Sequence, residues 1–289
     1  MHRLTIAVLA ALAAALTVVS LSAAAHQQAR KTQSFPHRII SLSPTVTEDL
    51  FAIGAGKQVI AVDQDSNYPR RAPRTSLSGF TPNSEAIAKY HPDLVLISYN
   101  PGNFASQLRQ LKIKVVNVAA AKDLPQSYRE ILRLGSLTGH VTGAKAVVRS
   151  MRTRLESIIR SVPKSRRHLR VYHELDPTYY SATSTTFIGS IYKLFGFKDI
   201  ADGADTTASG GYPQLSGEYI IQQNPQLIVL ADTKCCQQTA ATVAARPGWS
   251  TLAAVQHHRV VGVDDDVASR WGPRIVEFAR AVARIARKG

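Results

Sequence analysis

The longest regular pattern of apolar residues runs from Thr142 to Val162. Apolar side chains recur there at intervals of three and four, which places them on one face of a helix. The stripe consists of Ala144, Val147, Val148, Met151, Leu155, Ile158, Ile159 and Val162. Thr142 is the expected N-cap, and Pro163 stops the segment. At 1.5 Å per residue the pattern predicts one helix of roughly 30 Å, about the diameter of a small domain.

On both sides of this helix, short apolar runs that predict strands alternate with segments that predict helices. The expected strands are residues 38–42, 58–62, 93–98, 113–118, 169–173, 226–232 and 259–263. The expected helices are residues 44–53, 84–90, 104–111, 125–137, 187–195 and 218–223, with a last one opened by Pro273. This alternation predicts an α/β protein with two Rossmann-like lobes, each built on a parallel sheet and joined by the long helix.

The two predicted lobes also share a weak internal repeat. Glu85, Ile87, Pro92, Leu94 and Leu96 are each followed, at one constant offset along the chain, by a matching residue. The matching residues are Glu218, Ile220, Pro225, Leu227 and Val229. Such a fixed offset indicates that both lobes follow one design.

The start of the chain, up to Ala25, differs in kind from the rest. Arg3 precedes an apolar run over residues 4–19, and small residues follow at 22–25. This order is typical of a secretory signal peptide cleaved near Ala25; the alternative is an uncleaved membrane anchor. We expect an exported protein, in the periplasm or at the outer face of the cytoplasmic membrane. Its parts are then a signal at 1–25, a flexible lead-in at 26–36, an N-terminal lobe at 37–140, the linking helix at 141–163 and a C-terminal lobe at 164–289.

Composition and charge narrow the class of protein. With 45% hydrophobic and 19% charged residues, the 289-residue chain is typical of globular proteins. Its net charge of +15 raises the question of nucleic-acid binding. The basic residues, however, follow the outer faces of the long helix and the last helix, without interleaved aromatics or a helix-turn-helix pattern. We therefore expect no nucleic-acid partner; a solvated basic face and an attraction to an anionic envelope surface both stay open.

The two cysteines, Cys235 and Cys236, are adjacent. Export favours their oxidation, and adjacent cysteines can close a vicinal disulfide or bridge to another chain. Two free thiols in a loop are the alternative.

Polar and aromatic residues gather where predicted strands end. The set comprises Asp65, Tyr68, Phe80, Tyr99, Glu174, Tyr180, Tyr212, Asp266, Arg270 and Trp271. Parallel strands bind ligands beyond their carboxyl ends, and aromatics with a few polar groups typically line small-molecule clefts. The alternative is that these tyrosines pack against loops and the acids only cap or solvate. No catalytic motif of a hydrolase or nucleotide-binding enzyme occurs, and His257-His258 has no further metal ligand at helical spacing.

Four stretches of this chain resemble one known family, the class III substrate-binding proteins of ABC importers for cobalamin, heme and iron-siderophore complexes. They are RIISLSPTVTEDLFAIGAG, GFTPNSEAIAKYHPDLVL, YPQLSGEYIIQQNPQLIVL and SRWGPRIVEFARAV. The resemblance covers nearly all of the chain after the predicted signal. It implies two lobes on a long backbone helix, a small hinge movement and a ligand held between the lobes. It also implies that Glu85 and Glu218 dock onto arginines of the two permease subunits.

Within this family the chain is most similar to the cobalamin-binding branch. Tyr212 stands where an aromatic precedes the PQ of that branch, and Asp266 and Arg270 match its ligand contacts. Tryptophans expected in the first lobe are replaced by Gly79, beside Phe80, and by Tyr99. The resemblance thus predicts a binding protein without catalytic residues or a resident cofactor, whose ligand is itself a cobalt or iron complex. A monomer delivering cobalamin to a permease dimer is expected; a ferric siderophore or heme is the alternative.

Two other functions stay open from the residues alone. A protein for a bare metal ion would need ligands such as Asp65, His173, Glu174 and Asp266 to converge. An extracytoplasmic hydrolase would need a nucleophile and a base within reach of each other.

Overall fold

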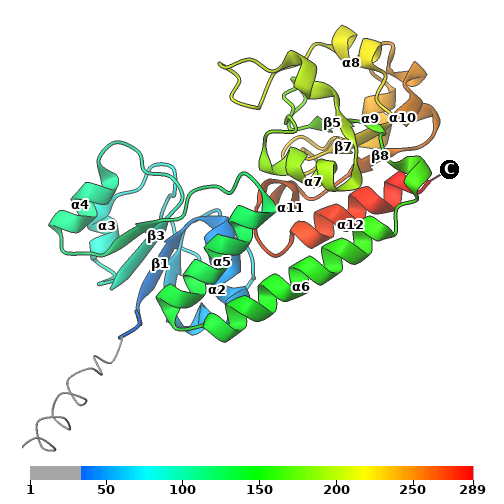
Figure 1. The fold of residues 1–289 in the computed structure, drawn as a ribbon. Coiled ribbons are helices and arrows are strands. Elements are labelled where there is room, and N and C mark those ends of the chain that lie inside the picture. The colour runs from blue at the N-terminus through cyan, green and yellow to red at the C-terminus, as the bar shows by residue number, and fades with distance from the viewer. Residues whose placement is uncertain (1–33, 289) are drawn as a thin grey trace, which may run out of the picture. The chain divides into compact units, whose positions relative to one another are not determined.

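Two parallel sheets of four strands each form the framework of the protein (Figure 1). The computed structural model describes residues 34–288. The predicted signal peptide and most of the lead-in lie outside the described residues. From Pro36 onward the chain forms one compact unit. Both sheets and their covering helices confirm the predicted α/β fold class.

The first sheet has the strand order β2-β1-β3-β4, and the second has the order β6-β5-β7-β8. The strands of the first sheet are β1 (Ile39–Leu42), β2 (Val59–Val62), β3 (Leu94–Ile97) and β4 (Val115–Asn117). Those of the second are β5 (Arg170–Glu174), β6 (Lys198–Asp199), β7 (Leu227–Leu230) and β8 (Val260–Gly262). All six neighbouring pairs are parallel. This parallel pairing places the carboxyl ends of each sheet's strands at a single edge.

Helices cover both faces of each sheet, because alternate residues of the central strands face opposite sides. The helices are α2 (Pro44–Ile53), α3 (Ser84–Ala88), α4 (Phe104–Gln110), α5 (Leu124–Thr138), α6 (Val141–Arg160), α7 (Phe187–Phe195), α8 (Gly217–Gln223), α9 (Ala240–Ala244), α10 (Ala253–Gln256), α11 (Asp265–Ser269) and α12 (Ile275–Ala286). Short 3-10 helices lie at Ala55–Gln58, Lys164–Arg166, Ile200–Ala204 and Trp249–Thr251. Leu94 and Leu96 of β3 join the core formed with α2, α5 and α6, whereas Val95 and Ile97 join the core formed with α3 and α4.

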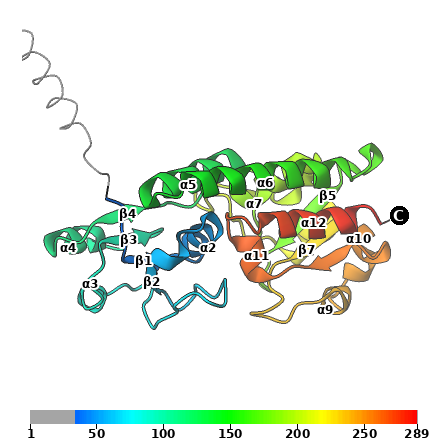
Figure 2. The same ribbon diagram turned by 90° about the horizontal axis from the view of Figure 1, so that it is seen from below.

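Helix α6 links the chain of the first sheet to that of the second (Figures 1 and 2). It packs against α2 and α5 on one side of the link and against α12 on the other. Its buried residues are Ala144, Val148, Met151 and Leu155. They belong to one continuous apolar core that includes residues of both sheets. Among the helices in the described part of the chain, none combines the length and apolar character needed to cross a bilayer.

The ends of α6 differ from the prediction. The helix begins at Val141, so Thr142 lies inside it and His140 takes the N-cap position without a side-chain hydrogen bond. The reason is that α5 ends in Gly139, which has a φ of 81°, leaving only two residues between the helices. At the other end, Val162 is buried but lies beyond the helix.

The internal repeat corresponds to matched elements of the two sheets. The offset that relates Glu85 to Glu218 also relates the first and last residues of β3 to those of β7, and each strand is third in the order of its sheet. Glu85 lies in the first turn of α3 and Glu218 in the first turn of α8. Short elements that the pattern did not predict, namely β6, α9, α10 and α11, complete the second lobe.

Candidate ligand-binding site

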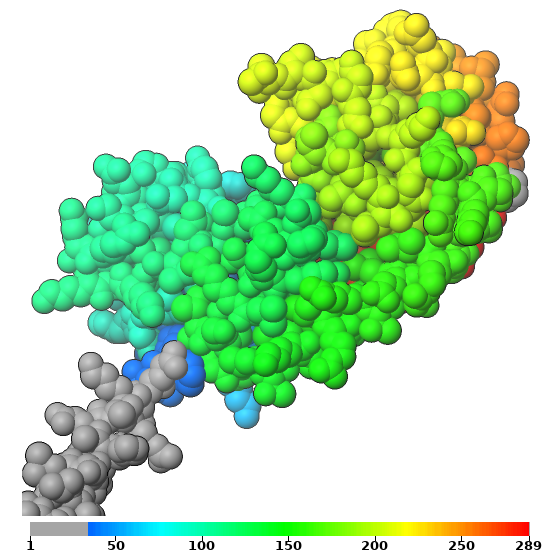
Figure 3. Space-filling view, in the orientation of Figure 1, coloured from blue at the N-terminus to red at the C-terminus, as the bar shows by residue number. Residues whose placement is uncertain are grey.

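A cavity of about 470 Å³ opens beyond the carboxyl ends of β1, β2 and β3. Residues 265–271, which connect β8 to α12, form its opposite wall. Its lining consists of Leu42, Ser43, Pro44, Thr45, Asp63, Asp65, Gly79, Phe80, Ser98, Tyr99, Asp265, Asp266, Ser269, Arg270 and Trp271. In the space-filling view, a hollow separates the cyan-to-green first lobe from the yellow second lobe (Figure 3). The cavity thus lies at the edge where a parallel sheet is expected to bind ligands.

Six of the ten predicted ligand-binding residues meet in this cavity: Asp65, Phe80, Tyr99, Asp266, Arg270 and Trp271. Phe80 is 70% exposed and Tyr99 is 55% exposed. Large aromatic side chains left this open on a cavity wall provide apolar area that a flat ligand can cover.

The other four predicted residues do not line the cavity. Tyr68 lies under the guanidinium of Arg274, 4.3 Å from its carbon to the ring centroid, and borders a separate groove. Tyr180 and Tyr212 are on exposed loops of the second lobe. Glu174 is fully buried and is not among the residues that line the cavity.

Glu174 is occupied by a bidentate ion pair. Both of its oxygens accept hydrogen bonds of 2.6 Å from Arg246, whose guanidinium also lies over the rings of Tyr179 and Trp249. The buried Asp232 is next to this pair, and burial, followed by the charge of Glu174, raises the pKa of Asp232 to about 7. The carboxylate of Glu174 is therefore engaged inside the second lobe.

Arg270 connects the two walls of the cavity. Its Nη1 donates to Glu48 Oε1 at 2.7 Å and to Asn67 Oδ1 at 2.9 Å. Its Nη2 donates to the carbonyl oxygen of Asp65 at 3.1 Å and to Asp266 Oδ1 at 2.8 Å. The side chain predicted to contact the ligand is thus held by the protein itself.

Glu48, on α2, completes this connection. It is 2% exposed and also accepts hydrogen bonds from Nε and Nη2 of Arg274, at 2.8 and 2.7 Å. Sequence reasoning missed Glu48, because nothing in a helical pattern indicates partners that lie in the last part of the chain. We call Glu48, Arg270 and Arg274 the arginine clamp.

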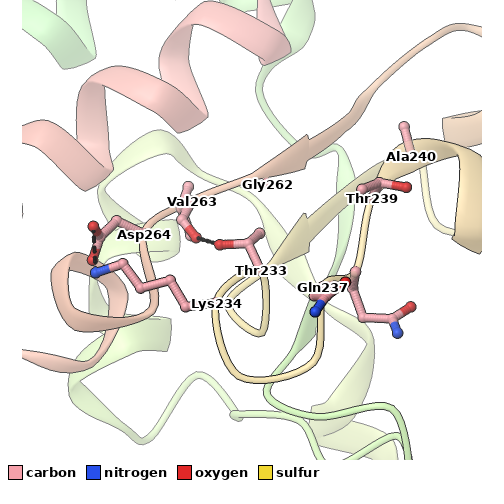
Figure 4. A pocket seen from close by; sticks show the side chains of 9 residues that line it. Thr233, Lys234, Gln237, Thr239, Ala240, Gly262, Val263 and Asp264 are labelled. Atoms are coloured by element: carbon pink, nitrogen blue, oxygen red, sulfur yellow. Dashed lines mark hydrogen bonds and ion pairs between the residues drawn. The ribbon is translucent and has the colours of Figure 1, made fainter.

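Asp266 also forms an ion pair with Lys234, which lies in the loop after β7. Lys234 Nζ lies 2.8 Å from Asp266 Oδ2 and 2.7 Å from Asp264 Oδ2. Figure 4 shows Lys234 reaching Asp264 while the neighbouring Thr233 donates to the carbonyl oxygen of Val263. Burial raises the pKa of Asp266, but the hydrogen bonds from Lys234 and Asn67 outweigh it, so that this pKa lies below its usual value.

The same loop contains the adjacent cysteines. Cys235 and Cys236 are joined by a disulfide, and the backbone N–H of Cys235 donates to Asp265 Oδ2 at 3.0 Å. Asp265 also accepts from Thr233 Oγ1 at 2.9 Å. The loop is therefore attached to the start of α11, which forms part of the cavity wall.

Several cavity residues carried no earlier prediction. Ser43, the N-cap of α2, accepts a 2.7 Å hydrogen bond from Ser98 Oγ. Asp63 follows β2 directly and is buried, with no partner for either carboxylate oxygen. The position of Asp63 at a strand end is the same signal that indicated Asp65.

The four residues named for a bare metal ion do not converge. His173 is buried and shares a 2.6 Å hydrogen bond with the hydroxyl of Tyr192, while Glu174 is bound by Arg246. Within residues 34–288, no group of three or more His, Cys, Asp or Glu side chains is arranged to hold a metal ion.

This fold and this site define a solute-binding protein with its ligand cavity at the strand ends. Residues 39–267 match the periplasmic binding protein family, and the chain belongs to it, which confirms the resemblance seen in the sequence. It is 32% identical over 258 residues to YvrC, an uncharacterized ABC transporter substrate-binding lipoprotein of Bacillus subtilis, covering 86% of this chain and 79% of YvrC. It is also 32% identical over 252 residues to a cobalamin-binding protein of Halobacterium salinarum, covering 84% and 68% of the two chains. The crystal structure of the vitamin B12 binding protein BtuF of Vibrio cholerae superimposes with a TM-score of 0.70 at 26% identity, covering 88% of this chain and 99% of BtuF.

Proposed function

We propose that the protein captures a corrinoid, with cobalamin as the preferred ligand, outside the cytoplasm and delivers it to an ABC importer. The observation that carries this proposal is the cavity at the strand ends that Phe80, Tyr99 and Trp271 line together with Asp266. The similarity to cobalamin-binding relatives over most of the chain supports it. The role is binding and release, without turnover of the ligand.

The aromatic side chains cover the flat face of the chelate. Carboxylate and hydroxyl groups of the wall, including Asp266 and Ser43, accept hydrogen bonds from its amide edge. Because the link between the lobes is one packed helix and the arginine clamp holds the far wall, we expect little closure on binding. Affinity then comes from a wall that is already in place.

Calorimetric titration of the purified protein with cyanocobalamin tests this proposal. We expect a 1:1 complex of about micromolar affinity or tighter, which corresponds to about −8 kcal/mol. Tyr99→Ala should weaken binding by about tenfold, since a large apolar contact is lost. Tyr180→Ala, an exposed tyrosine outside the cavity, is the matched control.

Titrations with heme and with ferric hydroxamate and catecholate siderophores complete the experiment. Binding of one of these, with no heat from cyanocobalamin, refutes the corrinoid proposal and leaves the solute-binding role. If none of them binds, the solute-binding role itself is refuted for metal chelates.

We further propose that Glu85 and Glu218 contact the two permease subunits of the importer. Both open equivalent helices of the two lobes. Two like charges presented in this way suit a partner with two equivalent basic sites. The protein acts as a monomer in this proposal.

Charge reversal separates docking from capture. Glu85→Lys and Glu218→Lys should abolish stimulation of the importer ATPase while cyanocobalamin affinity stays within about twofold. Glu156→Lys, on the exposed face of α6, is the matched control. Undiminished stimulation by the double variant would exclude these residues as docking points.

A further inference from the structure

The charges on the cavity wall are strongly unbalanced. Four carboxylates, from Asp63, Asp65, Asp265 and Asp266, line it, and Arg270 supplies the one positive charge among the lining residues. A ligand that enters this cavity meets an acidic surface.

Arg270 has no free pair of donors for an acidic ligand. A guanidinium has four Nη–H groups. The acceptors Glu48, Asn67, Asp65 and Asp266 each take one hydrogen bond from these nitrogens. A carboxylate of a ligand would have to displace one of them before it could bind Arg270 in the usual bidentate way.

Two of the four acids are already engaged within the protein. Asp265 accepts hydrogen bonds from Thr233, from the backbone of Lys234 and from Cys235. Asp266 is bound by Arg270, Asn67 and Lys234. These contacts offset the negative charge at the α11 side of the cavity.

The other two acids lie together after β2 and are not offset. Asp63 is 1% exposed, and neither of its oxygens has a hydrogen-bond partner in the structure. Burial is the main cause that raises the pKa of Asp63; the neighbouring Ser66 partly opposes it, and the charge of Asp65 adds to it. Asp65 is exposed, and no ion pair or side-chain hydrogen bond of its carboxylate occurs within residues 34–288. Unpaired carboxylates at a cavity wall favour a ligand that brings hydrogen-bond donors.

Gly79 brings Asp63 close to the cavity. A Cβ atom at Gly79 would lie 2.9 Å from Asp63 Oδ2 and 2.7 Å from the carbonyl oxygen of Leu42, so any side chain there would collide with both. Asp63 and Gly79 both line the cavity, and the missing side chain at Gly79 leaves room for the buried carboxyl group of Asp63 beside it. The charge of Asp63 therefore acts on a ligand at short range.

We propose that Asp65 and Asp63 form an acidic subsite that selects chelates whose edge carries amide or ammonium N–H groups and rejects chelates whose edge carries carboxylates. Asp65 accepts a hydrogen bond from the ligand, and Asp63, beside Gly79, adds negative potential. This inference rests on the proposed function, because it assumes a chelate in this cavity. It distinguishes amide-bearing corrinoids and cationic hydroxamate siderophores from heme, which carries two propionates.

Two corrinoids that differ in one group test the subsite. Cyanocobalamin carries neutral amide arms, and its monocarboxylic acid has one amide hydrolysed to a carboxylate. We expect the unmodified protein to bind cyanocobalamin at least tenfold more tightly than the acid at pH 7.5. Asp65→Asn and Asp63→Asn should each reduce this ratio at least threefold, by tightening the binding of the acid. Glu156→Gln, which removes a carboxylate far along the chain on α6, should leave the ratio unchanged.

The affinity ratio of cyanocobalamin to its acid separates the subsite from the corrinoid function. A ratio near one for the unmodified protein, or a ratio unchanged in both aspartate variants, overturns the acidic subsite while the corrinoid function stands. If neither corrinoid binds, the corrinoid function fails, and the same comparison is made between ferrioxamine B, which has a free ammonium group, and its N-succinyl derivative. A preference for the ammonium form that weakens in Asp65→Asn supports the subsite; equal binding, a preference for the succinyl form, or no binding of any probe overturns it.

Discussion

Replacing Glu48 by glutamine tests the arginine clamp. The substitution keeps the shape of the side chain and one acceptor oxygen, but it removes the negative charge between Arg270 and Arg274. Glu48 accepts three hydrogen bonds of 2.7–2.8 Å from these arginines. Since the side chain of Glu48 is 2% exposed, water has little access to this site and cannot solvate the two guanidinium groups in place of the carboxylate.

The expected cost follows from these contacts. A hydrogen bond to a charged group contributes about 1.5–3 kcal/mol, and breaking a buried ion pair costs about 3–5 kcal/mol. Arg270 retains Asp266, and Arg274 retains the ring of Tyr68, which limits the loss. We therefore expect Glu48→Gln to lower the free energy of unfolding by about 3 kcal/mol.

Urea denaturation followed by circular dichroism measures this loss, with Glu277→Gln as the control. Glu277 is exposed on α12, where the same chemical change should cost less than about 0.5 kcal/mol. Cyanocobalamin affinity should also fall in Glu48→Gln, because Arg270 holds the cavity wall. A loss below about 1 kcal/mol, or one equal to that of the control, would refute the account of the clamp.

Three further predictions concern buried or shared charges of the second lobe. Burial raises the pKa of Asp199 from 3.8 to about 8, so the folded protein holds a proton that the unfolded chain releases. Its contribution to stability therefore falls between these pH values by about 1.4 kcal/mol per pH unit, and Asp199→Asn should raise the melting temperature at pH 8.5 but not at pH 4. Arg246→Met should cost about 3–5 kcal/mol in denaturant unfolding, because it leaves the buried carboxylate of Glu174 without its partner; a loss below about 1 kcal/mol would contradict this role of the pair. Lys234→Met removes a donor that lowers the pKa of Asp266, so more of the Asp266 carboxylate is protonated at low pH in this variant. Calorimetry should therefore show a larger loss of ligand affinity at pH 4 than at pH 7, and an equal loss at both pH values would exclude this role of Lys234.

Local signals accounted for most of the fold. Helix α7 occupies residues 187–195 as predicted, because Thr186 caps its start and Gly196, with a φ of 75°, ends it. The offset of the repeat likewise predicted the matching of β3 with β7. Short elements such as β6 were not predicted, since two residues are too few to carry a periodic pattern.

The site was predicted only in part. The positions of Asp65 and Asp266 could be predicted because both follow strands. The alternation of strands and helices is enough to show that parallel strands end at one edge of the sheet. The partners of Arg270 and Glu174 could not be predicted, since a pattern along the chain does not say which distant charges will meet. As a result, Glu174 was expected to face a ligand although it is buried against Arg246. Pairing between distant residues is determined by packing and not by local preference.

The arginine clamp also bears on the order in which the protein folds. Glu48 precedes Arg270 by 222 residues and Arg274 by 226 residues. All four strands of the first sheet precede these arginines along the chain and are made, and on export are translocated, before them. Until the arginines follow, Glu48 has neither of its positively charged partners. The first lobe therefore reaches its final packing only after the C-terminal segment has arrived. A chain that is truncated before Arg270 would keep an uncompensated carboxylate in its interior, so we expect incomplete copies to open and to be cleaved by proteases more readily than complete ones.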